Sequence, residues 1–265
     1  MFILSGRPNS GQGEVPLERY RAFAFVDWDD TLVATNVLYS LANRENARDV
    51  LAALGEPAVV SEEEILTLAD EIDLAKVRTI GLSHSRYPEA WAEAYQQLAE
   101  KWGRPLEPAV VKRVRERAEQ VAWAPQEWLP GAQEALRVLR QAGAEISIWT
   151  AGEVEVQQHK LEHAFLSGQP VWQWVDQTVI VPDKDTAMLR QALGPRLTWP
   201  ERCLVIGNSP RADVRPALEL GVTAVWVQGD SWSYDRHPIG EDEPGLHRLA
   251  SLTQFPAWFE RWLQR

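Results

Sequence analysis

The sequence predicts an α/β protein with a doubly wound parallel sheet, Rossmann-like, and an inserted all-helical segment. Short apolar runs rich in β-branched and aromatic residues alternate with helical patterns, which is typical of parallel sheets. The alternation stops between about residues 36 and 125, where helical spacing continues with few strand signals. Polar residues follow four of the predicted strands, at the edge where open α/β sheets bind ligands.

The first 16 residues form an arm that we expect to be flexible. Residues 5–16 contain Gly, Pro, Ser and Asn, which favour turns and loops. The apolar stretch at residues 1–4 is too short for a signal peptide, and no later segment is expected to cross a membrane. The first strand follows at residues 22–26, and Asp27 ends it.

Residues 36–125 are interpreted as a separate helical insert. Four segments show the apolar spacing of helices, and Ser61 with Glu64 has the pattern of a capping box. Breaks that contain Gly with Pro or Ser separate the segments. The predicted helices are 36–54, 61–79, 87–102 and 106–123.

The remaining residues, 17–35 and 126–265, are predicted to form the α/β core. Strands and helices alternate there, as in a parallel sheet with helices on both faces. The polar stretch 228–248 is expected to be a long surface loop. The predicted strands are 22–26, 144–149, 178–181, 203–206 and 222–227, and the predicted helices are 129–141, 154–166, 184–193, 210–220 and 255–263.

Composition limits the partners that the chain can have. The net charge of −11 and the pI near 5.0 argue against nucleic acid and do not favour an anionic membrane surface. A small phosphorylated molecule remains compatible with a local positive site. Cys203 is the only cysteine, so no intrachain disulfide can form, and this usage fits a reducing cytoplasm. The oligomeric state is not legible in the sequence.

The most informative motif is Asp27-Trp-Asp-Asp-Thr-Leu32, directly after the first strand. Asp27 and Asp29 would repel each other at the mouth of the sheet unless a cation joined them, and Mg²⁺ prefers oxygen ligands. With a metal present, one carboxylate can act as nucleophile and the other as general acid and base. The alternative is a solvated turn that is acidic for solubility.

Polar residues of complementary kinds follow three later strands. They are Thr150, Lys184 and the segment 207–213, with the sequence Gly-Asn-Ser-Pro-Arg-Ala-Asp. The set supplies a hydroxyl, a cation and a metal-facing loop at one edge of the sheet. A further lysine, Lys160 in the predicted helix 154–166, is expected on a solvated helix face.

These four motifs, in this order, resemble those of the haloacid dehalogenase superfamily, and the insert resembles its type 1 cap. The resemblance implies that Asp27 attacks phosphorus and forms an aspartyl-phosphate. Asp29 would protonate the leaving oxygen and then activate water. The catalytic set would include Thr150 and Lys184, which hold the phosphoryl oxygens. The phosphate-binding residues assigned in this way are Asp30, Thr150, Ala151 and Lys184.

The resemblance also implies a Mg²⁺ site. Its ligands would be Asp27, the backbone carbonyl of Asp29, and the last motif through Asn208 and Asp213. The family usually has an acid where this chain has Asn208. An amide oxygen can bind magnesium but carries no charge. Asp213 can compensate directly or through water, so we expect weaker magnesium binding.

The sequence therefore predicts a magnesium-dependent phosphatase that hydrolyses a small phosphorylated metabolite. A phosphomutase would use the same residues but must return the phosphoryl group to its substrate. A dehalogenase would use Asp27 as nucleophile, yet it needs neither Asp29 nor a metal. A non-catalytic binding module on the same fold is the remaining alternative, and only Asn208 favours it.

Overall fold

The computed structural model describes residues 2–5, 16–55, 60–229 and 232–265. Within these residues the chain divides into two compact units, one formed by residues 1–36 and 125–265 and the other by residues 37–124. We call them the α/β unit and the helical unit. No helix in the described parts is both long and apolar enough to cross a membrane.

The α/β unit is built on a seven-stranded sheet with the order β1-β8-β5-β2-β9-β10-β11. Neighbouring strands are parallel except at one edge, where β1 pairs antiparallel with β8. The strands are β1 (Phe2–Ser5), β2 (Phe23–Val26), β5 (Glu145–Ala151), β8 (Gln177–Val181), β9 (Cys203–Gly207), β10 (Thr223–Val227) and β11 (Leu246–Leu249). Because β2 lies between β5 and β9, the first motif stands at the centre of the sheet.

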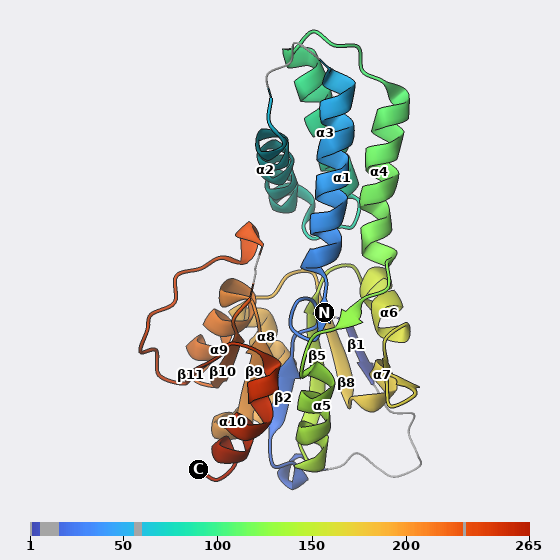
Figure 1. Cartoon of the computed structure of the whole chain (residues 1–265). Helices are drawn as coiled ribbons and strands as arrows, with labels where there is room; N and C mark the ends of the chain where they lie inside the picture. Colours follow the sequence, from blue (N-terminus) through green and yellow to red (C-terminus); the bar gives the residue numbers. More distant parts are fainter. Residues whose placement is uncertain (1, 6–15, 56–59, 230–231) are drawn as a thin grey trace. The chain divides into compact units, whose positions relative to one another are not determined.

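Helices cover both faces of this sheet, which confirms the predicted doubly wound class (Figure 1). On one face, Ala24 and Val26 of β2 pack in a core with α5 (Ala132–Gln141), α6 (Val154–Glu162), α7 (Val171–Trp174) and α10 (Phe255–Trp262). On the other face, Phe23 and Phe25 pack with α8 (Thr186–Leu193) and α9 (Arg215–Glu219). The alternation along β2 follows from side chains that point to opposite faces of a strand.

Short elements complete the α/β unit. β3 (Val33–Ala34) and β4 (Glu127–Trp128) pair antiparallel beside the two connections to the helical unit, and β6 (Phe165–Leu166) pairs with β7 (Gln169–Pro170). The 3₁₀ helices are η1 (Leu17–Arg19), η2 (Gly194–Thr198), η3 (Pro200–Arg202), η5 (Ser233–Asp235) and η6 (Leu252–Gln254), and η4 (Pro210–Val214) is a short π-helix that leads into α9.

In the described residues of the helical unit, the helices pack around an apolar core of their own (Figure 1). They are α1 (Asn36–Leu54), α2 (Glu62–Ile80), α3 (Arg86–Lys101) and α4 (Pro108–Trp123). α2 begins with the predicted capping box, in which Ser61 and Glu64 satisfy each other's backbone N–H groups. The buried ion pair of Arg86 with Asp73 joins α3 to α2.

Three details of the predicted organisation are wrong. Residues 2–5 of the predicted flexible arm form β1, an ordered edge strand, while residues 6–15 lie outside the described residues. Residues 246–248 of the predicted loop belong to β11, which extends the sheet beyond β10 and ends at Leu249. The helix predicted over 154–166 ends at Glu162, and the chain then turns into the β6–β7 hairpin.

Candidate active site

Asp27 lies at the carboxyl edge of the sheet, directly after β2. Its backbone N–H donates to the carbonyl of Ile206 in β9 (2.8 Å), so strand pairing continues up to the residue and holds it in place. The side chain is 8% exposed. A carboxylate so deeply buried requires partners, because burial without them is costly.

Lys184 and Asp213 provide the nearest charges. The ammonium of Lys184 donates to Oδ1 of Asp27 and to Oδ1 of Asp213, the second at 2.8 Å. Lys184 is 4% exposed and Asp213 1% exposed. The arrangement therefore encloses two carboxylates and one cation, away from solvent.

This cluster holds more negative charge than its single ammonium neutralises. Burial raises the pKa of Asp27 to about 7, the charge of Asp213 adds to the effect, and Lys184 only partly offsets it. Burial also raises the pKa of Asp213. For Lys184, burial alone would lower the pKa, but the two carboxylates raise it above its usual range. An additional cation beside Asp27 would relieve the imbalance.

The amide oxygen of Asn208 lies near Oδ2 of Asp27, whereas Lys184 binds Oδ1. The hydroxyl of Thr31 lies 2.7 Å from Oδ2 of Asp27 and 3.3 Å from Oδ1 of Asn208. Its single proton goes to the closer carboxylate. The two oxygens thus share one neighbour, and the amide oxygen keeps its capacity to bind a cation.

Asp213 is bound by protein donors at both oxygens. Lys184 binds Oδ1, and the backbone N–H of Ser209 donates to Oδ2 (3.1 Å). The close turn depends on Gly207, because a Cβ there would lie 2.2 Å from the carboxyl carbon of Asp213. Asp213 therefore anchors Lys184 and the loop that carries Asn208.

The residues present fit magnesium better than a metal that requires several His or Cys ligands. Among the described residues, no group of three or more His, Cys, Asp or Glu side chains is arranged to hold a metal. The oxygens of Asp27 and Asn208 are hard ligands, and magnesium is usually bound through one or two carboxylates with water and substrate phosphate completing the shell.

Thr150 and Ala151 are the last two residues of β5, the strand next to β2. Thr150 is 1% exposed, and its hydroxyl makes no hydrogen bond to any residue within the described ranges. The carbonyl of Ala151 accepts from the amide of Gln157 (2.8 Å). Parallel pairing of β5 with β2 places Thr150 at the same edge of the sheet as Asp27.

Asp29 has a different environment. Its Oδ1 accepts from Thr35 Oγ1 (2.6 Å), Lys160 Nζ (2.8 Å) and Gln126 Nε2 (3.0 Å), and its Oδ2 from Gln157 Nε2 (3.2 Å). Burial would raise the pKa of Asp29, but Lys160 and these hydrogen bonds outweigh it and lower the pKa to about 2. The solvated position predicted for Lys160 is therefore wrong: its side chain is 8% exposed and ion-paired.

Asp30 organises the turn after the first motif. Its Oδ1 accepts from the backbone N–H of Thr35 (2.9 Å) and of Asn36 (2.7 Å), at the start of α1. Its own N–H donates to the carbonyl of Val33 (2.8 Å). The backbone N–H and Oδ1 of Asp30 are thus engaged within the turn, and the phosphate-binding role of Asp30 stays a prediction.

A family model for haloacid dehalogenase-like hydrolases matches residues 20–221. The chain belongs to this family. Over 98 residues, this hydrolase is 32% identical to phosphoserine phosphatase of Thermus thermophilus, a match that covers 37% of the chain and 39% of the relative. It therefore spans about two fifths of the length of that relative.

Solved structures show the shared fold of this hydrolase. A haloacid dehalogenase-like family hydrolase from Xanthomonas campestris has a TM-score of 0.71 at 22% identity, with 92% of this chain and 97% of that chain covered. A 2-haloacid dehalogenase from Pseudomonas syringae pv. tomato DC3000 has a TM-score of 0.50 at 20% identity, with 91% and 99% covered.

The sequence reasoning missed a second polar network in the hydrolase. Arg211 donates to both carboxylate oxygens of Asp183 (2.9 and 3.2 Å) and lies over the ring of Tyr234, 4.0 Å from its centroid. Tyr234 donates to Asp183 (2.7 Å), and Asp183 accepts the backbone N–H of Lys184 (2.8 Å). The position of Asp183 next to Lys184 in the sequence could have indicated this network. Nothing in the sequence distinguishes Tyr234 from the other residues of the polar stretch 228–248.

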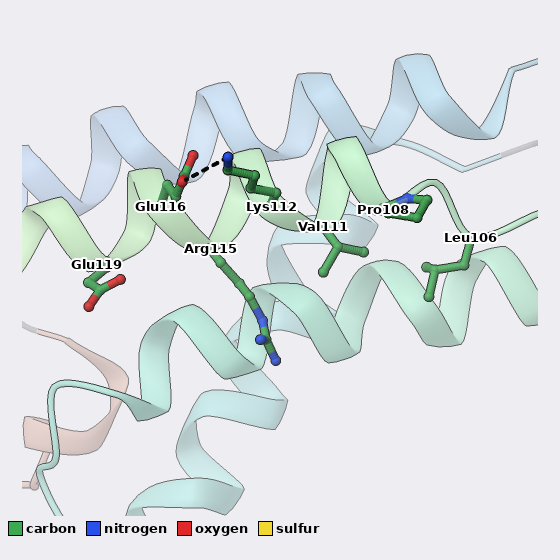
Figure 2. Close-up of a pocket in the computed structure, with 7 residues that line it drawn as sticks. All are labelled: Leu106, Pro108, Val111, Lys112, Arg115, Glu116 and Glu119. Atoms are coloured by element: carbon green, nitrogen blue, oxygen red, sulfur yellow. Dashed lines mark ion pairs between the residues drawn. The ribbon is translucent and has the colours of Figure 1, made fainter.

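A pocket in the helical unit has a different character (Figure 2). Its lining residues are Leu106, Pro108, Val111, Lys112, Arg115, Glu116 and Glu119. Lys112 pairs with Glu116 at 3.7 Å, and Arg115 pairs with Glu89 at 2.5 Å, in both cases with exposed side chains. Exposed pairs of this kind contribute little, and the pocket contains none of the predicted site residues.

Proposed function

We propose that the chain is a magnesium-dependent phosphatase that hydrolyses a small phosphomonoester through an aspartyl-phosphate. The observation that carries this proposal is the buried contact of Asp27 Oδ1 with Lys184, together with the Thr31 hydroxyl that contacts both Asp27 Oδ2 and the amide oxygen of Asn208. A nucleophilic carboxylate with a fixed cation and a metal-binding oxygen nearby suits the attack on an anionic phosphoryl group.

The chain's residues divide the reaction between them. Asp27 attacks phosphorus while Asp29 passes a proton from the phosphate monoester monoanion to the leaving oxygen, so the bond from phosphorus to that oxygen breaks. Lys184 and Thr150 hold the phosphoryl oxygens. Asp29 then takes a proton from water, which attacks phosphorus and releases inorganic phosphate from Asp27.

Asp27, Asn208 and the backbone carbonyl of Asp29 would hold the magnesium ion. When bound, the ion supplies positive charge to the phosphoryl oxygens. Asp213 does not need to be a ligand in this proposal, because its Oδ1 binds Lys184 and its Oδ2 binds the fixed backbone N–H of Ser209. Oδ2 of Asp27, by contrast, contacts the hydroxyl of Thr31, which can rotate to another acceptor.

The similarity to a phosphoserine phosphatase supports phosphomonoester chemistry and makes phosphoserine a reasonable first substrate. Dehalogenases share the fold. Asp29, however, has no task in a dehalogenase, and its four hydrogen-bond donors favour a reaction that uses the carboxylate.

The test is turnover of 4-nitrophenyl phosphate, phosphoserine and 2-chloropropionate by the full chain, each with magnesium and with EDTA. We expect phosphate release that needs magnesium, and no halide release. Halide release without metal would identify a dehalogenase. Absence of phosphate release from a broad panel of phosphomonoesters would contradict the proposal.

A further inference from the structure

We propose that Lys160 is a positioning residue for Asp29, which leaves Oδ2 of that carboxylate as the oxygen that gives and takes the proton. This inference rests on the proposed phosphatase function. It concerns a residue outside the four motifs, on α6.

The two carboxylate oxygens of Asp29 have unequal contacts. Oδ1 of Asp29 has three donors within 3.0 Å, from Thr35, Lys160 and Gln126, while Oδ2 has one longer contact to Gln157 at 3.2 Å. A carboxylate oxygen has about two lone-pair sites. Oδ1 is therefore fully occupied, and Oδ2 retains room for a proton.

The donors come from three separate parts of the α/β unit. Thr35 precedes α1, Gln126 precedes β4, and Lys160 lies on α6. The amide of Gln126 also donates to the hydroxyl of Thr35 (2.6 Å), so the first two support each other. Three contacts from three directions hold the plane of the carboxylate, as catalytic geometry requires.

α6 is itself tied to the phosphoryl-binding strand end. Gln157 and Lys160 are three residues apart and share one face of the helix. Gln157 donates to the carbonyl of Ala151, directly after Thr150. Lys160 is 8% exposed, as expected for a side chain directed into the site and not into solvent. One helix thus places Asp29 relative to the end of β5.

The contribution of Lys160 should depend on how much the leaving group needs a proton. Removal of the ammonium leaves Thr35 and Gln126 as the donors to Oδ1 and removes the contact from α6, so the carboxylate is held less firmly at the position from which it protonates the leaving oxygen. An alkyl leaving group depends on that acid, whereas 4-nitrophenolate leaves without it. General acid catalysis typically contributes about 10²-fold or more.

The experiment measures kcat/KM of Lys160→Met with magnesium across 4-nitrophenyl phosphate, phenyl phosphate and phosphoserine. We expect a loss of about 10²-fold for the alkyl ester and less than about 3-fold for the nitrophenyl ester. Lys160→Arg should recover part of the alkyl activity because it keeps a cation. Lys112→Met, an exposed lysine on α4 (73% exposed), is the matched control and should match wild type.

Thr35→Val removes a second donor to Oδ1 and should show the same selective loss to a smaller degree. If Lys160→Met does not fold, this variant decides. A common loss factor across the three esters, or no loss, would overturn the role of Lys160. Failure of the wild-type chain to release phosphate from any ester would instead contradict the proposed function.

Discussion

Asp27 and Asp29 lie two residues apart, and their surroundings differ in the balance of charge. Asp27 shares one lysine, Lys184, with a second buried carboxylate, Asp213, and burial raises its pKa to about 7. Asp29 has Lys160 as its own partner, and its pKa falls to about 2 although burial acts in the opposite direction. Two carboxylates share one ammonium around Asp27 (the first region), whereas Asp29 (the second region) has an ammonium of its own. A divalent cation would therefore bind beside Asp27.

Loss of the carboxylate in the first region should have the largest effect. Asp27→Asn should lower turnover by roughly 10⁴-fold or more, because the amide is a poor nucleophile. The fold should survive, since one of two buried carboxylates that share Lys184 becomes neutral. Steady-state assays and circular dichroism measure the two effects, with the exposed Asp242→Asn as control. Residual activity above about one per cent would contradict the assignment of the nucleophile.

Removal of Lys184, the cation that Asp27 and Asp213 share, should cause the largest loss of folding stability. Lys184→Met leaves Asp27 and Asp213 buried without the cation that they share, which typically costs about 3–5 kcal/mol. Urea unfolding measures this loss. Asp213→Asn in the same background should recover part of the stability, because one uncompensated charge is removed. If the double variant is no more stable than Lys184→Met, the two carboxylates are not coupled through Lys184.

The second region is tested by Asp29→Asn. The aspartyl-phosphate should persist about 10²-fold longer than in wild type, because no carboxylate takes the proton from water. A pulse of 4-nitrophenyl phosphate followed by acid quenching at successive times measures its lifetime. An intermediate that decays at the wild-type rate would show that Asp29 is not the base.

The smallest expected effect is that of a negative charge added beside Asp27. Asn208→Asp adds a formal charge beside Asp27 and should lower the half-saturating magnesium concentration several-fold. Magnesium titration of activity is the measurement, and Gln120→Glu on the exposed face of α4 controls for the added negative charge. An unchanged titration would mean that residue 208 does not face the metal.

The sequence allowed prediction of the parallel sheet and of the polar residues at its strand ends. Buried strands such as residues 23–26 are apolar throughout, and the side chain after each such run must fall at the edge of the sheet. β1 and β11 were missed because they are short edge strands, and β11, with the sequence Leu-His-Arg-Leu, has little apolar character.

The contacts of Lys160 and Asp213 could not be predicted from the sequence. Helical spacing places Lys160 on a face of α6, but only the tertiary fold brings that face to Asp29. The choice between Asn208 and Asp213 as the metal-facing residue depends on a turn at Gly207 that directs the Asp213 carboxylate toward Lys184. Which side chain reaches which partner depends on the exact path of the backbone, and the pattern of residue types does not specify that path.

Covalent phosphorylation of Asp27 is the step on which the proposed function depends, and chemical trapping detects it. The Asp29→Asn variant, which should accumulate the intermediate, is mixed with 4-nitrophenyl phosphate and magnesium, quenched, and reduced with borohydride, which converts an aspartyl-phosphate to homoserine. Mass spectrometry of the peptides then locates the change. We predict homoserine at position 27 and nowhere else. Unmodified Asp27 in a variant that still releases 4-nitrophenol, or homoserine at another aspartate, would contradict the account.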